Sequence, residues 1–223
     1  MYACAQNPRK LFRGPGEALN RLRYTPPTLR LPPTPRPPRL SRAGVIAVFY
    51  GALAGIAVIW GATRGHADIY RMPGVPLDVR RVATNLAAGV AFGLVFVAIT
   101  RYMAHRHQWA RDIHQEFRHL LGPLAARETV ILALASSIGE ESFFRGALVP
   151  HVGVIASSVL FGLLHIGPGP RFVRFLPWTL ASFLVGLALG ALMREGGDLS
   201  GPIAAHFTIN YLNLRYIAEK DLG

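Results

Sequence analysis

With 51% hydrophobic and only 16% charged residues among its 223, the chain is more apolar than an ordinary soluble domain, and its mean hydropathy is +0.31. A net charge of +12 raises nucleic-acid binding as one interpretation. That interpretation is disfavoured, because the charged residues cluster between long uncharged runs and no soluble segment is long enough to form a core. The composition therefore predicts a membrane protein that binds the lipid bilayer and no nucleic acid.

Residues 1–42 form a separate basic segment. They contain nine of the 24 Lys and Arg residues against one acidic residue, Glu17, and seven prolines fall between Pro26 and Pro38. So many prolines disfavour helix and sheet, which predicts a disordered, extended, polyproline-II-like tail. We expect a cytoplasmic tail that fixes orientation and contacts anionic lipid, with a docking peptide for a partner as the alternative. Cys4 is the only cysteine, which excludes an internal disulfide and a cysteine-based zinc site.

Long apolar runs in residues 43–223 predict an all-α, polytopic membrane bundle of about six transmembrane helices. At a rise of 1.5 Å per residue, a run of about 20 residues is long enough to cross a bilayer. Four of the runs are 19 to 21 residues long and contain no Asp, Glu, Lys or Arg. The other two, the third and the sixth in chain order, are shorter or contain more polar residues. In chain order the six lie at residues 43–63, 82–100, 129–139, 146–164, 175–193 and 199–214.

The distribution of basic residues predicts the orientation. Five Arg residues lie in residues 101–127, whereas residues 64–81 hold four basic and two acidic residues. If the N-terminus is cytoplasmic, six spans place residues 1–42, residues 101–127 and the C-terminus on the same side, which is the positive-inside pattern. We therefore expect a multi-pass protein of the plasma (inner) membrane with both termini in the cytoplasm.

Residues 101–122 are predicted to form an amphipathic helix in the headgroup region. Apolar Trp109, Ile113 and Phe117 recur at a spacing of four, while His114 and Arg118 are expected to lie off that stripe. The several histidines of this segment could alternatively bind a metal ion as a cluster. However, they point in different directions around the predicted helix and lie among arginines. An interfacial cationic helix is the favoured interpretation.

Small residues are expected to serve packing between helices. Three spans carry glycine pairs four residues apart, a spacing that allows close approach of helices in lipid. The pairs are Gly51/Gly55, Gly89/Gly93 and Gly186/Gly190. The serines at positions 136, 137, 157 and 158 are likewise interpreted as small packing residues.

Polar side chains inside the apolar runs mark the candidate site. A charged group costs roughly 3 kcal/mol or more to insert at the centre of a membrane helix, so such residues are functional candidates. Three pairs four residues apart each share one helix face. The residues are Glu140, Glu141 and Arg145, then Phe161 and His165, and finally His206 and Asn210. Three helices are therefore predicted to present polar groups to a common interior.

The chemistry of these groups indicates hydrolysis. Glu141 is expected to pair with Arg145, whereas Glu140, about 100° away on the helix, is the better general base toward water. His165 would orient the same water, and two further side chains, His206 and Asn210, would donate hydrogen bonds to the developing oxyanion.

A metal site is an alternative that the sequence leaves open. Glu140, His165 and His206 also match a ligand set for a divalent metal such as zinc, although no H-E-x-x-H motif is present.

Three motifs carry a resemblance to a known family. E-E-S-F-F-R at 140–145, F-G-L-L-H at 161–165 and H-F-T-I-N at 206–210 resemble the EExxxR, FxxxH and HxxxN motifs of the CPBP family. This family, also called Abi, contains CAAX-prenyl endopeptidases and bacteriocin-processing or self-immunity proteins. The three motifs occur in the family's order, and the resemblance covers roughly residues 128–215.

The resemblance implies an all-helical intramembrane endopeptidase whose cavity opens to the cytoplasm. It implies that Glu140 and His165 activate water and that His206 and Asn210 bind the oxyanion. Glu141 and Arg145 would then be largely architectural. Members of the family are described both as glutamate proteases and as metalloproteases, and the sequence leaves both catalytic types open.

Two other classes of function are carried as alternatives. A proton- or ion-coupled transporter would also use paired glutamates and histidines, but no inverted repeat is evident and the polar groups lie in the last half of the chain. A non-catalytic membrane scaffold or immunity protein would tolerate loss of Glu140, whereas an enzyme would not. For the enzyme, the expected substrate is a protein with a membrane-anchored segment. Prenylated CAAX termini, bacteriocin precursors and sorting-signal tails are the candidates.

Overall fold

The computed structural model describes residues 41–66, 68–167 and 172–222, and within these ranges it is helical with no β-strand. The expected all-α fold is confirmed. The predicted proline-rich tail and Cys4 fall in residues 1–40, outside the described residues. The helical segments are α1 (Arg42–Thr63), α2 (Val79–Arg106), α3 (Gln108–Leu121), α4 (Ala126–Glu141), the π-helical η2 (Ser142–Leu148), α5 (Val149–Leu164), α6 (Phe172–Gly196) and α7 (Ser200–Glu219).

Four of the described helical stretches are long and apolar enough to cross a membrane. They are Arg42–Thr63, Val79–Arg106, Ala126–Leu164 and Phe172–Gly196. The chain therefore has the character of a membrane protein, but the predicted count of six spans is not confirmed. The difference arises because α4 to α5 form one continuous 39-residue stretch and because α7, with its polar residues, is not among the four.

The 39-residue stretch from α4 to α5 folds back on itself. The Ser157 hydroxyl donates a hydrogen bond of 2.8 Å to the carbonyl oxygen of Phe144, although a straight helix would hold residues 13 apart at about 20 Å. Gly153 provides the break, since its φ of 80° and ψ of 168° are not helical and favour glycine. The segment is therefore a helical hairpin, and Ser157 serves in hydrogen bonding besides packing.

Helix starts follow ordinary capping chemistry. The Ser41 hydroxyl accepts a hydrogen bond from the Gly44 N–H at the start of α1, and the Asp78 carboxylate accepts from the N–H groups of Arg80 and Arg81 at the start of α2. Such caps satisfy amides that lack a partner in the first turn. The two long helices therefore begin where the sequence supplies a short polar side chain.

The segment predicted as one interfacial helix is divided between two helices. Residues 101–106 continue α2, and α3 begins only at Gln108. His114 is buried, with its Nε2 2.9 Å from the Lys220 carbonyl oxygen, and Arg118 donates hydrogen bonds to the carbonyl oxygens of Ile217 and Ala218. His114 and Arg118, which are expected to lie off the apolar stripe, thus contact the end of α7, because the last carbonyl groups of α7 need donors and these side chains supply them.

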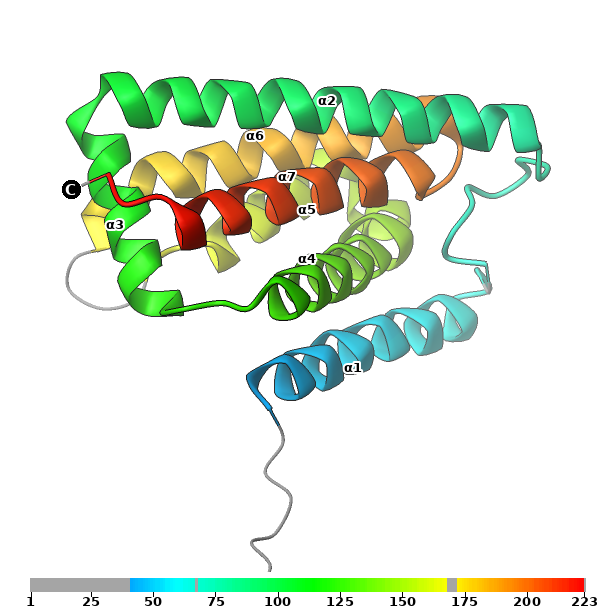
Figure 1. Cartoon of the computed structure of the whole chain (residues 1–223). Helices are drawn as coiled ribbons and strands as arrows, with labels where there is room; N and C mark the ends of the chain where they lie inside the picture. Colours follow the sequence, from blue (N-terminus) through cyan, green and yellow to red (C-terminus); the bar gives the residue numbers. More distant parts are fainter. Residues whose placement is uncertain (1–40, 67, 168–171, 223) are drawn as a thin grey trace, which may run out of the picture. The chain divides into compact units, whose positions relative to one another are not determined.

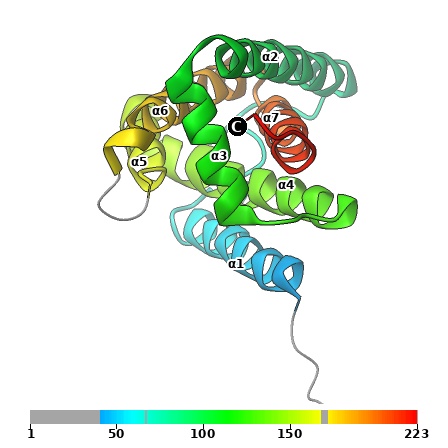
Figure 2. The same ribbon diagram turned by 60° about the vertical axis from the view of Figure 1, so that its left-hand side comes forward.

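The helices of the last half surround α7. Helix α7 packs between α2 and α4, α5 packs against α6, and α1 packs against α4 and η2 (Figures 1 and 2). Two of the predicted glycine pairs lie at such contacts. A Cβ at Gly89 or Gly93 would collide with α7, and one at Gly186 or Gly190 would crowd or collide with α5. The pair Gly51/Gly55 differs, because its Cβ positions meet nothing within 4 Å among the described atoms.

Gly89→Ala is expected to destabilise the protein by about 1–3 kcal/mol. The added methyl group would lie 2.8 Å from the carbonyl carbon of Gly201 and would force α2 and α7 apart. Thermal unfolding of the purified protein in detergent measures the effect. Gly51→Ala is the matched control, since the same methyl group there meets open space and should leave the midpoint within error or raise it slightly. Equal midpoints for both variants would contradict the described contact between α2 and α7.

Candidate active site

The predicted site residues come from four helical elements and are brought close together. Glu140 and Glu141 end α4, Arg145 lies in η2, His165 follows the last residue of α5, and His206 lies in the second turn of α7. All of these except His165 are buried. The π-helical turn begins directly after the two glutamates, and such turns often occur at functional sites.

A buried ion pair lies at the centre of the cluster. Arg145 Nη1 is 3.0 Å from Glu141 Oε1, with side-chain exposures of 1% and 0%. The same guanidinium donates to the Gly186 carbonyl oxygen of α6 at 3.3 Å and lies 4.4 Å from the centre of the Phe161 ring. Phe161 thus provides a cation–π face for Arg145. The spacing of four predicted the ion pair, but the contacts to α6 and to the ring depend on tertiary packing.

Glu141 has a second partner that the sequence did not reveal. Its Oε1 also accepts a hydrogen bond from His206 Nδ1 at 2.7 Å. The two residues are 65 positions apart, so no local spacing signals this contact. Glu141 therefore does more than pair with Arg145. It also fixes the imidazole plane of His206, as the aspartate does in a catalytic triad.

Glu140 faces both histidines. Its Oε2 lies 3.9 Å from His165 Nε2 and 3.8 Å from His206 Nε2, and it is buried without a hydrogen-bond partner among the described protein groups. On the other side of the ring, His165 Nδ1 lies 2.7 Å from the carbonyl oxygen of Phe161. A carbonyl oxygen only accepts, so Nδ1 carries the proton, and in the neutral ring Nε2 is an acceptor turned toward Glu140.

Asn210 joins the cluster through a serine. Its Nδ2 donates a hydrogen bond of 3.0 Å to Ser136 Oγ, one turn before Glu140 on α4. The interpretation of Ser136 as a packing residue was incomplete, because it orients the Asn210 amide. One N–H of that amide engages Ser136, and the second is left for another acceptor. A serine four residues before a motif glutamate is the only sequence signal that points to this contact.

The predicted metal ligands do not fit a tetrahedral zinc site as they stand. With bonds of 2.0–2.1 Å, neighbouring ligand atoms are about 3.3 Å apart. Glu140 Oε2 lies 3.9 Å from His165 Nε2 and 3.8 Å from His206 Nε2, and the described residues contain no group of three His, Cys, Asp or Glu side chains suited to hold a metal ion. A metalloprotease is therefore not shown.

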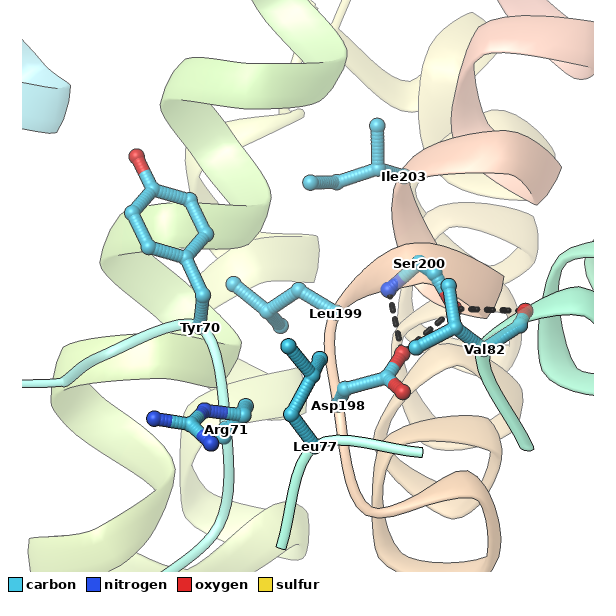
Figure 3. Close-up of a pocket in the computed structure, with 8 residues that line it drawn as sticks. All are labelled: Tyr70, Arg71, Leu77, Val82, Asp198, Leu199, Ser200 and Ile203. Carbon is cyan, nitrogen blue, oxygen red and sulfur yellow. Dashed lines mark hydrogen bonds between the residues drawn. The ribbon is translucent and has the colours of Figure 1, made fainter. Parts of the chain in front are cut away.

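A cavity of about 350 Å³ lies elsewhere, at the turn between α6 and α7 (Figure 3). Asp198 lines it, and its carboxylate accepts hydrogen bonds from Asn85 Nδ2, from the Ser200 N–H and from the Ser200 hydroxyl. This network caps α7 and ties it to α2, while the remaining lining is mostly apolar. Asp198 therefore has a structural role at this end of the bundle, away from the glutamate and histidine cluster.

Comparison with known proteins agrees with the motifs. Residues 123–212 match the family model described as type II CAAX prenyl endopeptidase Rce1-like, and this segment contains all three motifs. Residues 123–212 are therefore similar to this family, which agrees with the resemblance of the motifs to the CPBP family. The description of the family model is that of a CAAX-type peptidase, and the match agrees with the membrane character of the helices. Residues 1–122 lie outside the matched segment.

One curated relative is similar to part of the chain. The uncharacterized protein YpbD of Bacillus subtilis (strain 168) is 35% identical over 81 residues, which cover 36% of this chain and 41% of the relative. The chain thus spans about two fifths of the length of that protein. No solved structure matches the chain.

Proposed function

We propose that this protein is an intramembrane endopeptidase that hydrolyses a peptide bond near a membrane-anchored segment of a protein substrate. The observation that carries the proposal is the position of Glu140 Oε2, a buried carboxylate oxygen that faces the Nε2 atoms of His165 and His206. The match of residues 123–212 to the family model supports the class of reaction, and the geometry supports the choice of residues.

In the first step, Glu140 acts as the general base. A water molecule that donates one hydrogen bond to Glu140 Oε2 and one to His165 Nε2 is oriented by both acceptors. Transfer of its proton to Glu140 leaves a hydroxide that attacks the carbonyl carbon of the scissile bond. Proton transfer of this kind contributes roughly 10²–10⁴-fold to a rate.

In the second step, the carbonyl oxygen becomes negative and needs donors. The second N–H of Asn210 supplies one, because Ser136 holds the amide in place through the first. His206 supplies the other through Nε2–H of an imidazolium ring whose Nδ1–H bonds to the Glu141 carboxylate.

In the third step, the C–N bond breaks. Glu140 returns the proton that it took from water to the leaving nitrogen, so that an amine and a carboxylic acid are formed and the enzyme is regenerated. No group outside the cluster is needed for this balance. The catalytic type is therefore that of a glutamate protease in which two histidines orient and stabilise the reacting groups.

The substrate is proposed to be a protein with a membrane-anchored or C-terminal sorting segment. A cluster buried among the helices is reached most readily by a chain that is itself in the membrane. The matched family acts on CAAX prenyl proteins by its description, and prenylated termini are one candidate. Bacteriocin precursors and sorting-signal tails are the others. High Arg, Ala, Gly and Pro content suggests a GC-rich bacterial genome, which favours these other candidates.

The proposal is tested by comparing protein termini in membranes of cells that carry the wild-type chain or Glu140→Gln at matched expression. New termini that appear with the wild type and vanish with the variant would support proteolysis and identify the substrate. Identical termini, with the variant inserted at the same level, would reject the peptidase and favour a scaffold or a transporter.

Asn210→Ala is expected to lower kcat about 10²–10³-fold with little change in KM, because a donor to the oxyanion acts mainly in the transition state. The assay uses a synthetic peptide that spans the cleavage site found from the termini. Asn213→Ala on the same helix is the control, since Asn213 accepts a hydrogen bond from the Thr100 hydroxyl outside the cluster. A kcat for Asn210→Ala equal to that of the control would remove Asn210 from the mechanism.

A further inference from the structure

His165 lies at the end of its helix rather than within it. It follows the last residue of α5, with φ of −98° and ψ of 17°, and its backbone N–H donates to the Gly162 carbonyl oxygen. Its side chain is 21% exposed, compared with 7% for His206 and 11% for Glu140. Because the carbonyl groups at a helix end have no partner within the helix, contacts from outside α5 are needed to fix this residue.

Helix α6 provides such a contact to the main chain of His165. It packs against α5 (Figures 1 and 2), and Gly162 allows a close approach, since a Cβ there would be 3.0 Å from the Phe183 Cβ. One turn earlier on α6, the Thr179 hydroxyl donates a hydrogen bond of 3.1 Å to the His165 carbonyl oxygen. This bond satisfies a carbonyl group at the end of α5 and anchors the backbone of His165 to α6.

Trp178, the neighbour of Thr179, contacts the imidazole ring of His165. The two ring centroids are 5.0 Å apart and the planes are inclined at 61°, which is an edge-to-face arrangement. A second aromatic ring against the imidazole is that of Phe161 in α5, at 4.3 Å. The indole is itself packed against Phe117 of α3, with centroids 4.9 Å apart. A row of rings thus runs from α3 through α6 to the proposed catalytic cluster.

We propose that Trp178 is a positioning residue for the reaction, which holds the His165 ring so that Nε2 stays turned toward the water at Glu140. This inference rests on the proposed function. The hydrogen bond from Nδ1 to the Phe161 carbonyl oxygen fixes one atom of the ring, about which the ring can still pivot, and contact with the rigid indole limits that pivot. The complete site then extends through Phe117 to α3, which lies outside the matched segment 123–212.

Trp178→Leu tests the inference. Leucine fills part of the space but has no flat ring, so the imidazole spends less time in the productive orientation. We expect kcat to fall about tenfold with KM unchanged, because the effect is on the chemical step and not on substrate binding. Trp178→Phe keeps an aromatic ring at this position and should keep kcat within about twofold of the wild type.

Trp60→Leu is the matched control. Trp60 of α1 also contacts a histidine of α5, His151, with ring centroids 6.3 Å apart and planes at 54°. His151 lies in the first turn of α5, at the opposite end from His165. The same substitution there should leave kcat at the wild-type value.

A double-substitution cycle shows whether Trp178 acts through His165. Once His165→Gln has removed the ring, adding Trp178→Leu should cause no further fall in the rate of hydrolysis. A further fall as large as that in the wild-type background would overturn the inference. Single-turnover hydrolysis with enzyme in excess makes these slow rates measurable.

Thr179→Val serves the same cycle where Trp178→Leu does not fold in detergent. Valine has nearly the shape of threonine but lacks the hydroxyl that holds the His165 carbonyl oxygen. We expect a fall of about threefold or more in the wild-type background, the size expected for loss of one hydrogen bond, and none in the His165→Gln background. An equal fall in both backgrounds would overturn the inference.

The outcomes separate this inference from the proposed function. The assay uses the full chain in detergent and the peptide that spans the cleavage site found from the termini, with wild type and Glu140→Gln measured alongside. If wild type and Glu140→Gln do not differ, the proposed function fails and the inference falls with it. If they differ while Trp178→Leu retains wild-type kcat, only the inference is overturned. A raised KM for Trp178→Leu, or a kcat for Trp178→Phe as low as that of Trp178→Leu, also overturns it, because Trp178 would then serve binding or its aromatic contact would not matter.

Discussion

Glu140→Gln is expected to slow hydrolysis about a thousandfold or more while the protein stays folded. Glutamine has the shape of glutamate but takes no proton from water, so the loss falls on general-base catalysis, which contributes roughly 10²–10⁴-fold. Because Oε2 is buried without a hydrogen-bond partner, removing its charge should leave the unfolding midpoint unchanged or raise it. Steady-state hydrolysis of the cleavage-site peptide measures kcat, and thermal unfolding in detergent measures the unfolding midpoint.

Glu219→Gln is the matched control for this variant. Glu219 is an exposed glutamate paired with Arg215 at the end of α7, and the same chemical change there should leave kcat unaltered. If Glu140→Gln retained more than a tenth of the wild-type kcat, Glu140 would not be the base.

Arg145→Met is expected to destabilise the protein by about 3–5 kcal/mol, because it leaves the Glu141 carboxylate as a buried charge without its cation. Methionine retains the length of the side chain and much of its apolar contact with Phe161, so the loss reports on charge rather than on volume. Thermal unfolding in detergent is the measurement.

Arg215→Met provides the matched control. Arg215 pairs with Glu219 four residues away, as Arg145 does with Glu141, but at side-chain exposures of 49% and 55%. Loss of that exposed pair should cost at most about 1 kcal/mol. If both substitutions lowered the free energy of unfolding by a similar amount, burial of the ion pair would not determine how much its loss destabilises the protein.

Local spacing was enough to predict the helices and the central ion pair. Glu141 and Arg145 are four residues apart on one helical stretch, so their contact follows from helix geometry alone. The motif order also predicted that Glu140, His165 and His206 would meet, since each sits inside an apolar run where a polar side chain needs a polar neighbour.

Contacts between distant residues could not be predicted in this way. The Glu141–His206 and Ser136–Asn210 hydrogen bonds join positions 65 and 74 apart, and their formation depends on how α7 packs against α4. The partner of His114 could not be predicted either, because amphipathicity places this residue off the apolar stripe but does not reveal the carbonyl oxygen at the end of α7 that it contacts.

The number of membrane spans could not be predicted from hydropathy for a different reason. The polar residues 140–145 separate two predicted runs, but the helical stretch continues through them, so the composition does not show where the chain reverses. The reversal depends on a backbone conformation at Gly153 that is accessible to glycine and costly for other residues.

The dependence of the site on α7 has a consequence for biosynthesis. Helix α7 follows the helices α1 to α6 in the chain and is therefore made after them, and it carries both His206 and Asn210. Until it packs between α2 and α4, Glu140 lacks one of its two histidines and Glu141 has only Arg145. A partly synthesised chain would thus hold its base without the donors for the oxyanion. In the proposed mechanism, a chain that still lacks α7 would therefore not hydrolyse neighbouring proteins.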